Sequence, residues 1–183
     1  MSSTRLWMNT VSYDLCSGPP QVRDALQFMT SATRFYLVIA AYSSITDNEM
    51  ERCTHISYDK NVSETMLHFN WISHWRGSWV LDDTYFETYI LPANKDVRSN
   101  MIATFSPEYT QYGRNYSLLF AAKGACFILR HLGDMAHGSK PPSIPYDCEL
   151  WVASKYANQN ATACHQVFDQ MCVQKKLDST CST

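Results

Sequence analysis

Short stretches of apolar or alternating side chains, separated by turn residues, run through most of the chain. Residues 35–42 (FYLVIAAY) are aromatic and β-branched, which predicts a strand. In segment 114–122, polar Asn115 and Ser117 alternate with apolar neighbours, so one face would be wet and the other buried. Further strand-like segments lie near 51–59, 64–75, 78–82, 84–91, 98–105 and 125–131, and Asp82-Asp83, Pro92-Ala93-Asn94, Ser106-Pro107 and Lys123-Gly124 are the predicted turns between them. Consecutive short strands at hairpin spacing predict an antiparallel barrel or sandwich.

Helical patterns flank these strands. Residues 1–19 are predicted to be an irregular arm, and Pro20 can begin a helix that continues to Met29. The Gly- and Pro-rich segment 133–147 is expected to be a long loop, followed by a short strand at 148–152. A C-terminal helix is predicted over 162–175, because apolar residues recur there at helical spacing.

Composition narrows the class of protein. The 183 residues fit one domain, and the net charge of −2 provides no electrostatic footprint for nucleic acid. The longest apolar run, 35–42, is far too short to span a bilayer. Aromatic residues make up 13 % of the chain and charged residues 17 %, which fits either an aromatic-lined cavity or a dense core.

Cysteines and glycosylation sequons indicate an extracellular protein. Disulfides persist in oxidising compartments, and Asn-X-Ser/Thr is glycosylated only on the secretory route. The start of the chain has no apolar segment typical of a signal peptide, which favours a mature chain behind an added initiator Met. The seven cysteines are Cys16, Cys53, Cys126, Cys148, Cys164, Cys172 and Cys181, and the sequons begin at Asn61, Asn115 and Asn160.

The block Cys148–Val152 (CELWV), followed by spaced cysteines, resembles the tick salivary lipocalins, the family that includes the histamine-binding proteins. The chain is more similar to the immunomodulatory, lipid-binding, Japanin-like members, although it lacks the general lipocalin Gly-x-Trp signature. The resemblance implies one lipocalin domain over 1–183, an all-β fold: an eight-stranded antiparallel barrel with an N-terminal helix and a C-terminal helix packed on the wall. It also rests on Phe35–Val38, on Cys53 and Cys126 in their strands, on Cys164 before Phe168, and on Cys181 near the end.

The same resemblance implies a disulfide map, which spacing alone cannot give. The implied bridges are Cys53–Cys181, Cys126–Cys164 and Cys148–Cys172, which would pin the C-terminal helix and tail to the barrel wall. Cys16 is left over, either free, capped by a mixed disulfide, or the link in a covalent dimer. The expected state is therefore a monomer or a Cys16-linked dimer.

A lipocalin barrel encloses one cavity, and strand parity predicts its lining. If Asn115 faces out to carry a glycan, Tyr116, Leu118 and Phe120 face in. A bulge in any strand would flip this parity. The expected ligand-binding residues are Tyr36, Val38, Tyr42, Phe69, Trp71, Tyr116, Leu118 and Phe120 from parity, and Phe127, Glu149 and Trp151 from the family resemblance.

The resemblance separates two ligand classes. Amine-binding members place an Asp after the cysteine that matches Cys126 and a Glu at the position of Glu149, and two carboxylates suit a cationic amine. This chain has Phe127 at the first position, and Ser43-Ser44-Ile45-Thr46 where amine binders often carry Asn-Asp-Pro. The expected ligand is therefore largely apolar. Glu149 is either a ligand contact or a structural carboxylate bonded to a nearby tyrosine or arginine.

The implied function is a secreted lipocalin that sequesters a host lipid, leukotriene, fatty acid or sterol and modulates immune or inflammatory responses. The alternatives are a histamine or serotonin scavenger, and a surface-acting immunomodulator that binds a host protein or cell. No nucleophile elbow, P-loop or Cys-x-x-Cys indicates an enzyme, and nothing indicates a cofactor. His55, His68 and His74 lie on neighbouring strands, but surface histidines are far commoner than a metal site of three or four ligands.

Overall fold

The computed structural model describes residues 25–41, 52–75, 77–89, 100–104, 113–122, 124–134, 147–157, 162–172 and 176–178. The expected arm over 1–19, and the predicted roles of Cys16, Tyr42, Asn160 and Cys181, lie outside these residues. The strands are β1 (Arg34–Ala41), β2 (Arg52–Asn61), β3 (Met66–Trp75), β4 (Ser78–Tyr89), β5 (Asn100–Thr104), β6 (Arg114–Ala122), β7 (Cys126–Asp134), β8 (Asp147–Ala153) and β9 (Lys176–Asp178). The helices are α1 (Ala25–Met29), the 3-10 turn η3 (Ser154–Tyr156) and α2 (Thr162–Met171).

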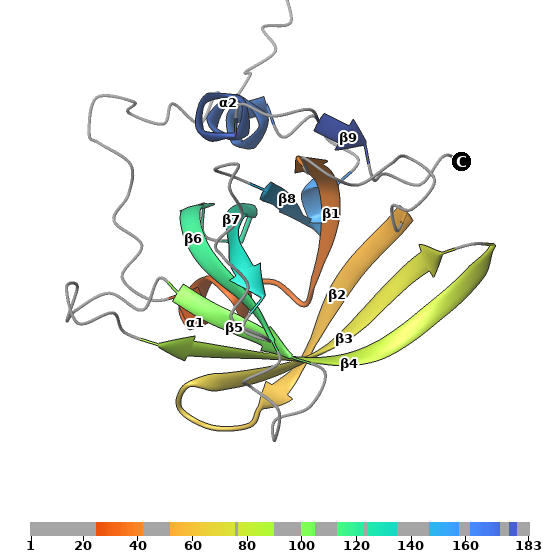
Figure 1. The fold of residues 1–183 in the computed structure, drawn as a ribbon, viewed down its shortest axis with the longest axis vertical. Coiled ribbons are helices and arrows are strands. Elements are labelled where there is room, and N and C mark those ends of the chain that lie inside the picture. Colours follow the sequence, from red (N-terminus) through yellow and green to blue (C-terminus); the bar gives the residue numbers. More distant parts are fainter. Residues whose placement is uncertain are drawn as a thin grey trace, which may run out of the picture.

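Strands β1 to β8 form the predicted antiparallel barrel. Strands β2 to β8 pair in sequence order, β8 pairs with β1, and β1 closes the barrel against β2 through Arg34–Tyr36. The short β9 pairs with the other end of β1, at Ile39–Ala41 (Figure 1). The eight-stranded lipocalin barrel expected from the sequence is therefore confirmed.

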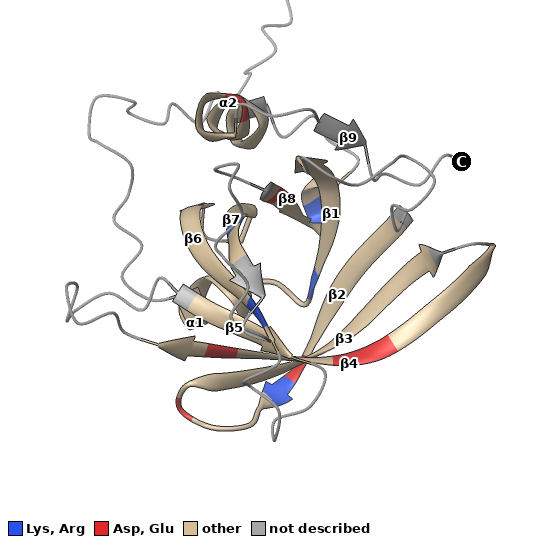
Figure 2. Ribbon diagram, in the orientation of Figure 1, with Lys and Arg blue, Asp and Glu red and all other residues tan. Residues whose placement is uncertain are grey.

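Strand β4 differs from its prediction. The sequence pattern placed a turn at Asp82-Asp83, yet both residues lie inside one continuous strand of 12 residues. The chain turns before Ser78, between the predicted segments 64–75 and 78–82, where Gly77 has a φ of 83°, a left-handed conformation that favours glycine. Both aspartates are exposed (Figure 2). Their charges therefore stay in water, and a position inside a strand does not bury them.

Two apolar clusters stabilise the fold, one inside the barrel and one outside it. Helix α1 packs into the inner cluster through Ala25 and Met29. Helix α2 covers the outer wall, where Phe168 is fully buried against residues of β7 and β8 (Figure 1). The C-terminal helix on the barrel wall is thus confirmed, although it ends at Met171 rather than at 175. None of the described helices is long and apolar enough to cross a membrane.

Disulfides tie α2 to the wall at both of its ends. Cys126 of β7 bonds Cys164 in the first turns of α2, and Cys148 of β8 bonds Cys172 directly after the helix. Both bridges are those that the family resemblance implied. Cys53 is also disulfide-bonded, and Cys181, its expected partner, lies outside the described residues.

Candidate functional site

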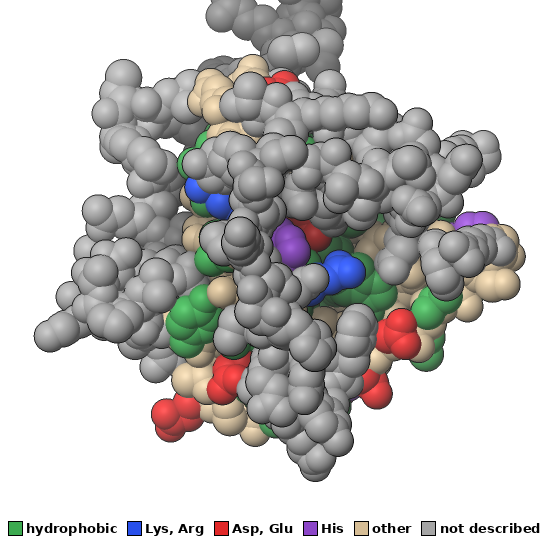
Figure 3. All heavy atoms as spheres, in the orientation of Figure 1, with side chains coloured by type: hydrophobic (Ala, Val, Ile, Leu, Met, Phe, Trp, Pro, Cys, Tyr) green, Lys and Arg blue, Asp and Glu red, His purple; other side chains and the backbone are tan. Residues whose placement is uncertain are grey.

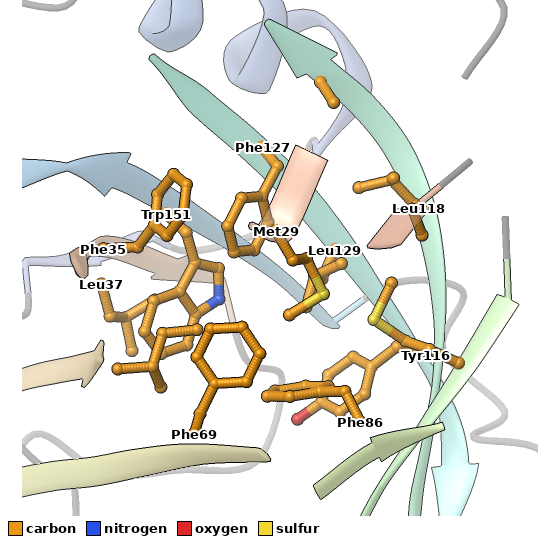
Figure 4. Packing of buried hydrophobic residues seen from close by; sticks show 14 of the residues in the cluster. Met29, Phe35, Leu37, Phe69, Phe86, Tyr116, Leu118, Phe127, Leu129 and Trp151 are labelled. Atoms are coloured by element: carbon orange, nitrogen blue, oxygen red, sulfur yellow. The ribbon is translucent and has the colours of Figure 1, made fainter. Parts of the chain in front are cut away.

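Aromatic side chains converge inside the barrel. The ring centroids of Phe35 and Phe127 lie 4.8 Å apart, and those of Phe69 and Phe86 lie 5.5 Å apart, both edge to face. Trp151 adds a stacked contact with Phe127 at 6.0 Å. Figure 4 shows these rings pointing toward one another, with Met29 and Leu129 between them. Edge-to-face pairs contribute about 0.5–1.5 kcal/mol each beyond their buried area.

One carboxylate lies within this apolar interior. Glu149 of β8 is 3 % exposed, and its two oxygens accept hydrogen bonds from different donors. The hydroxyl of Tyr116 donates to Oε1 at 3.3 Å, and the indole Nε1 of Trp151 donates to Oε2 at 3.0 Å. A buried carboxylate needs such donors, because an unpaired polar group in an apolar medium is costly. The site is therefore an aromatic interior with one oriented polar centre.

Tyr116 serves this centre as a hydrogen-bond donor. Burial raises the pKa of its phenol far above the usual value of 10, and the nearby charge of Glu149 raises it further. The charge of Arg114 opposes these two effects without cancelling them. Tyr116 thus keeps its proton at physiological pH and holds the carboxylate in place.

Most of the predicted lining residues lie on the inner side of the barrel. Parity assigned two positions on β3 and two on β6 correctly, and the family resemblance did so for one position on β7 and two on β8. These inward residues are Phe69, Trp71, Tyr116, Leu118, Phe127, Glu149 and Trp151. Their contact with a ligand stays a prediction.

The inward orientation predicted for Tyr36 and Val38 on β1 is wrong. Phe35 and Leu37 occupy the inner cluster, so Tyr36 faces outward, where its ring lies 5.2 Å from that of His55. The register with β8 shifts between Leu37 and Ile39, and Val38 is the additional residue of this bulge. Val38 packs in the outer cluster because Leu37 before it faces in, and the bulge keeps Ile39 outside as well and returns Ala40 to the inner cluster.

Phe120 is a second correction, and here a bulge is the physical cause. The register between β6 and β7 shifts between Leu118 and Phe120, so Leu119 is the additional residue. Leu119 and Phe120 both pack in the outer cluster, and Ala121 returns to the inner one. Two neighbouring apolar side chains thereby reach the outer wall where the cluster beneath α2 lies.

The sequence prediction missed other buried residues of the inner cluster. Two sequence patterns could have indicated some of them: the alternation of Thr84, Phe86 and Thr88 on β4, and the run of apolar residues on β7. The missed inner residues include Met29, Phe35, Leu37, Phe86, Met101 and Leu129.

Two of the three sequons lie in the described part. Asn61 is exposed at the end of β2. Asn115 is half-buried, and its Oδ1 accepts a hydrogen bond from the hydroxyl of Tyr89 at 2.5 Å. Asn115 lies on the opposite face to buried Tyr116, as parity predicted. Glycan attachment at these sequons stays a prediction.

The histidines of β2 and β3 lie apart from the interior, whereas the ring of His131 on β7 lies 5.5 Å from that of Tyr116. His68 is held on the outer wall between Asp59, at 2.9 Å, and Asp83, at 3.0 Å. His74 contacts the ring of Trp79 instead. Within the residues that the structure describes, no group of three or more His, Cys, Asp or Glu side chains is arranged to hold a metal ion.

A family model described as tick histamine binding protein matches residues 19–181. The chain belongs to the tick histamine-binding protein family. No curated protein matches it at a significant level.

Solved structures agree on the fold. Lobster apocrustacyanin A1 is similar with a TM-score of 0.56 and 10 % identity, covering 85 % of this chain and 79 % of that one. AM182 in complex with serotonin has a TM-score of 0.55 and 15 % identity, covering 82 % and 84 %. The siderocalin Ex-FABP, described as having dual ligand specificities, has a TM-score of 0.58 and 9 % identity, covering 84 % and 95 %. The family and fold are those of lipocalin-type binding proteins, which hold small ligands in the barrel.

Proposed function

We propose that this protein captures a small, largely apolar molecule inside its barrel. The observation that carries the proposal is the interior itself, where aromatic side chains surround one carboxylate that already accepts two hydrogen bonds. An acyl chain or sterol gains roughly 0.8 kcal/mol for each methylene that it buries among such side chains. One polar group on the ligand, such as a hydroxyl, would set its orientation against Glu149.

The charge inside the barrel argues against an amine. Glu149 is the one carboxylate among the buried side chains of the described residues. A cationic amine entering this interior would lose its water and meet a carboxylate already bonded to Tyr116 and Trp151. An underpaired buried charge costs several kcal/mol.

An amine scavenger is nevertheless the second candidate, because a buried carboxylate is the group that such a ligand requires. The similarity to a serotonin-bound structure and the histamine-binding family model also support it. The two candidates differ in what Glu149 contributes. An amine depends on its negative charge, whereas an apolar ligand depends on the surrounding rings.

The proposed setting is extracellular, in a host that the secreted protein acts upon. The disulfides and the family support secretion, and capture of a lipid mediator there would dampen inflammation or immune activation. The alternative is that the protein acts through its outer surface on a host immune protein or cell, with the barrel as a scaffold.

Calorimetry on protein from eukaryotic cells tests the proposal. The titrants are a fatty acid, a leukotriene, cholesterol, histamine and serotonin. We expect binding of at least one of the first three, with Glu149→Gln changing its affinity by less than tenfold (about 1.4 kcal/mol). If the protein instead binds histamine tightly and no lipid, and if Glu149→Gln abolishes the histamine binding, the amine hypothesis would replace the apolar one. Tyr89→Phe, which removes a hydroxyl outside the barrel, is the control variant.

A further inference from the structure

Among the strands that the structure describes, none covers one edge of half of β4. Residues 85–89 of β4 pair with β5, whereas β3 pairs with β4 from Ser78 onward. No described strand pairs with Ser78–Asp83 on the side away from β3. Strand edges of this kind present a row of hydrogen-bonding groups to any chain that approaches.

The register fixes which backbone groups point to this open side. The amide of Thr88 donates to the carbonyl of Thr65 at 2.8 Å, so Thr88 directs its backbone groups toward the β3 side. The pairing of β3 with β4 has no register shift, so even-numbered residues of β4 do the same throughout. The N–H and C=O groups of Trp79, Leu81 and Asp83 therefore point outward from the open edge.

The same odd-numbered residues expose apolar side chains. Thr84 and Phe86 face the barrel interior, so Trp79 and Leu81 lie on the outer face. Trp79 is 63 % exposed and Leu81 is 68 % exposed. Figure 3 shows hydrophobic side chains at the surface over this β3–β4 arm. A large aromatic and a leucine left in water beside an open edge are the combination that favours strand pairing.

We propose that two copies of this chain associate by antiparallel pairing of their Ser78–Asp83 edges, centred on Val80. In this register Trp79 lies opposite Leu81 of the second copy and Leu81 lies opposite its Trp79. Residues opposite each other in an antiparallel pair share a face, so two apolar cross-strand pairs form across the two-fold axis. The register also places odd-numbered residues opposite odd-numbered ones, as the outward backbone groups require.

Charge disfavours the neighbouring registers. Pairing centred on Asp82 would place this carboxylate opposite its own copy, and like charges directly opposite are destabilising. Pairing centred on Leu81 would place Trp79 opposite Asp83. The register centred on Val80 instead places Asp82 opposite Ser78 and Asp83 opposite Gly77. This self-complementarity selects a second copy, rather than another protein, as the occupant.

The dimer is expected to be reversible. Six residues of edge and two apolar pairs form a contact smaller than the roughly 1,200–2,000 Å² of stable interfaces. Sedimentation velocity of the full chain over about a hundredfold range of concentration should show a monomer that converts to a dimer. Leu81→Lys should raise the dimer dissociation constant at least tenfold. The control Val62→Lys, at an exposed valine distant from this edge, should leave the constant unchanged.

Two cysteine variants test the register. Val80 would lie directly opposite its own copy at a Cα separation of about 4.5 Å, so Val80→Cys should give a covalent dimer on mild oxidation. Leu81→Cys should not, because its two copies would be separated by more than about 7 Å. A chain that stays monomeric at every concentration overturns the proposal. So does a dimer that Leu81→Lys leaves intact, including one linked through Cys16, or cross-linking by Leu81→Cys in place of Val80→Cys.

Discussion

The hydroxyl of Tyr116 on β6 donates to Oε1 of Glu149, which lies 33 residues further along the chain on β8, two strands away in the barrel wall. Both side chains are buried, and Trp151 donates to the other oxygen. Of the two roles expected for Glu149, the structural one with a tyrosine partner is present in the protein. Contact with a ligand is compatible with it, since a carboxylate can accept about four hydrogen bonds.

We predict that Tyr116→Phe lowers the free energy of unfolding by about 2 kcal/mol, because it removes a donor to a buried carboxylate. Denaturant unfolding followed by tryptophan fluorescence measures this change. Tyr89→Phe, which removes a hydroxyl bonded to half-buried Asn115, should cost about 1 kcal/mol or less. Equal losses for the two variants would contradict a special role for the interior hydrogen bond.

The comparison between sequence and structure depends on which face each strand turns inward and on where a bulge changes that face. On β7 and β8, which pair with each other without a register shift, the family resemblance placed Phe127, Glu149 and Trp151 correctly. On β6 parity failed at Phe120, because a bulge adds one residue to the strand. On β1 the face was assigned wrongly from Tyr36 onward, before the bulge of that strand, because apolar residues occupy both of its faces. Both bulges put adjacent apolar residues into the outer cluster that α2 covers. The contact of these residues with α2 joins segments that are distant in sequence, so no local sequence pattern could predict it.

The turn expected at Asp82-Asp83 failed for a related reason. Aspartate pairs are common in turns, and turn propensity is a local property. Here Asp83 is hydrogen-bonded to His68 on the neighbouring strand β3, and the segment containing Gly77 forms the hairpin turn. Pairing with β3 along its whole length keeps β4 extended. Tertiary pairing thus overrides the local preference.

The two bridges of α2 give a second prediction. They close loops with sequence separations of 38 and 24 residues, for Cys126–Cys164 and Cys148–Cys172. Because loop-closure entropy depends only weakly on loop length, replacing either pair by alanine should lower the free energy of unfolding by about 3–4 kcal/mol. Guanidinium unfolding of the two double variants measures both values. A loss below about 1 kcal/mol for either pair would show that α2 is held mainly by packing.

His55 gives a prediction for pH. Burial lowers its pKa below 6.5, and the positive charge of Arg34 lowers it further, against a hydrogen bond to the carbonyl of Cys53. The unfolded chain therefore binds more protons than the folded one as the pH falls below 6.5, and stability decreases in that range. Urea unfolding should show that the stability of the protein relative to His55→Gln is greatest above pH 6.5 and shrinks below it. Parallel pH profiles would contradict this linkage.

The ligand preference can be redirected at Phe127, which lies opposite Trp151 on the inner face and packs edge to face on Phe35. Glu149 is paired with Leu129, two residues along β7, so Phe127→Asp would place a second carboxylate diagonally across from it. Such diagonal neighbours lie roughly 7–8 Å apart, close enough for one ammonium group to contact both.

We therefore predict that Phe127→Asp increases histamine affinity at least tenfold and weakens lipid binding, because it removes a ring from the apolar lining. The measurement is calorimetry with histamine and a fatty acid on the protein, on Phe127→Asp and on Phe127→Asn. The asparagine variant matches the size of the new side chain without its charge, so it should lose lipid affinity without gaining histamine affinity. Both variants are expected to be less stable, since they place a polar group in a buried apolar position. An unchanged preference in a folded Phe127→Asp variant would mean that residue 127 does not face the ligand.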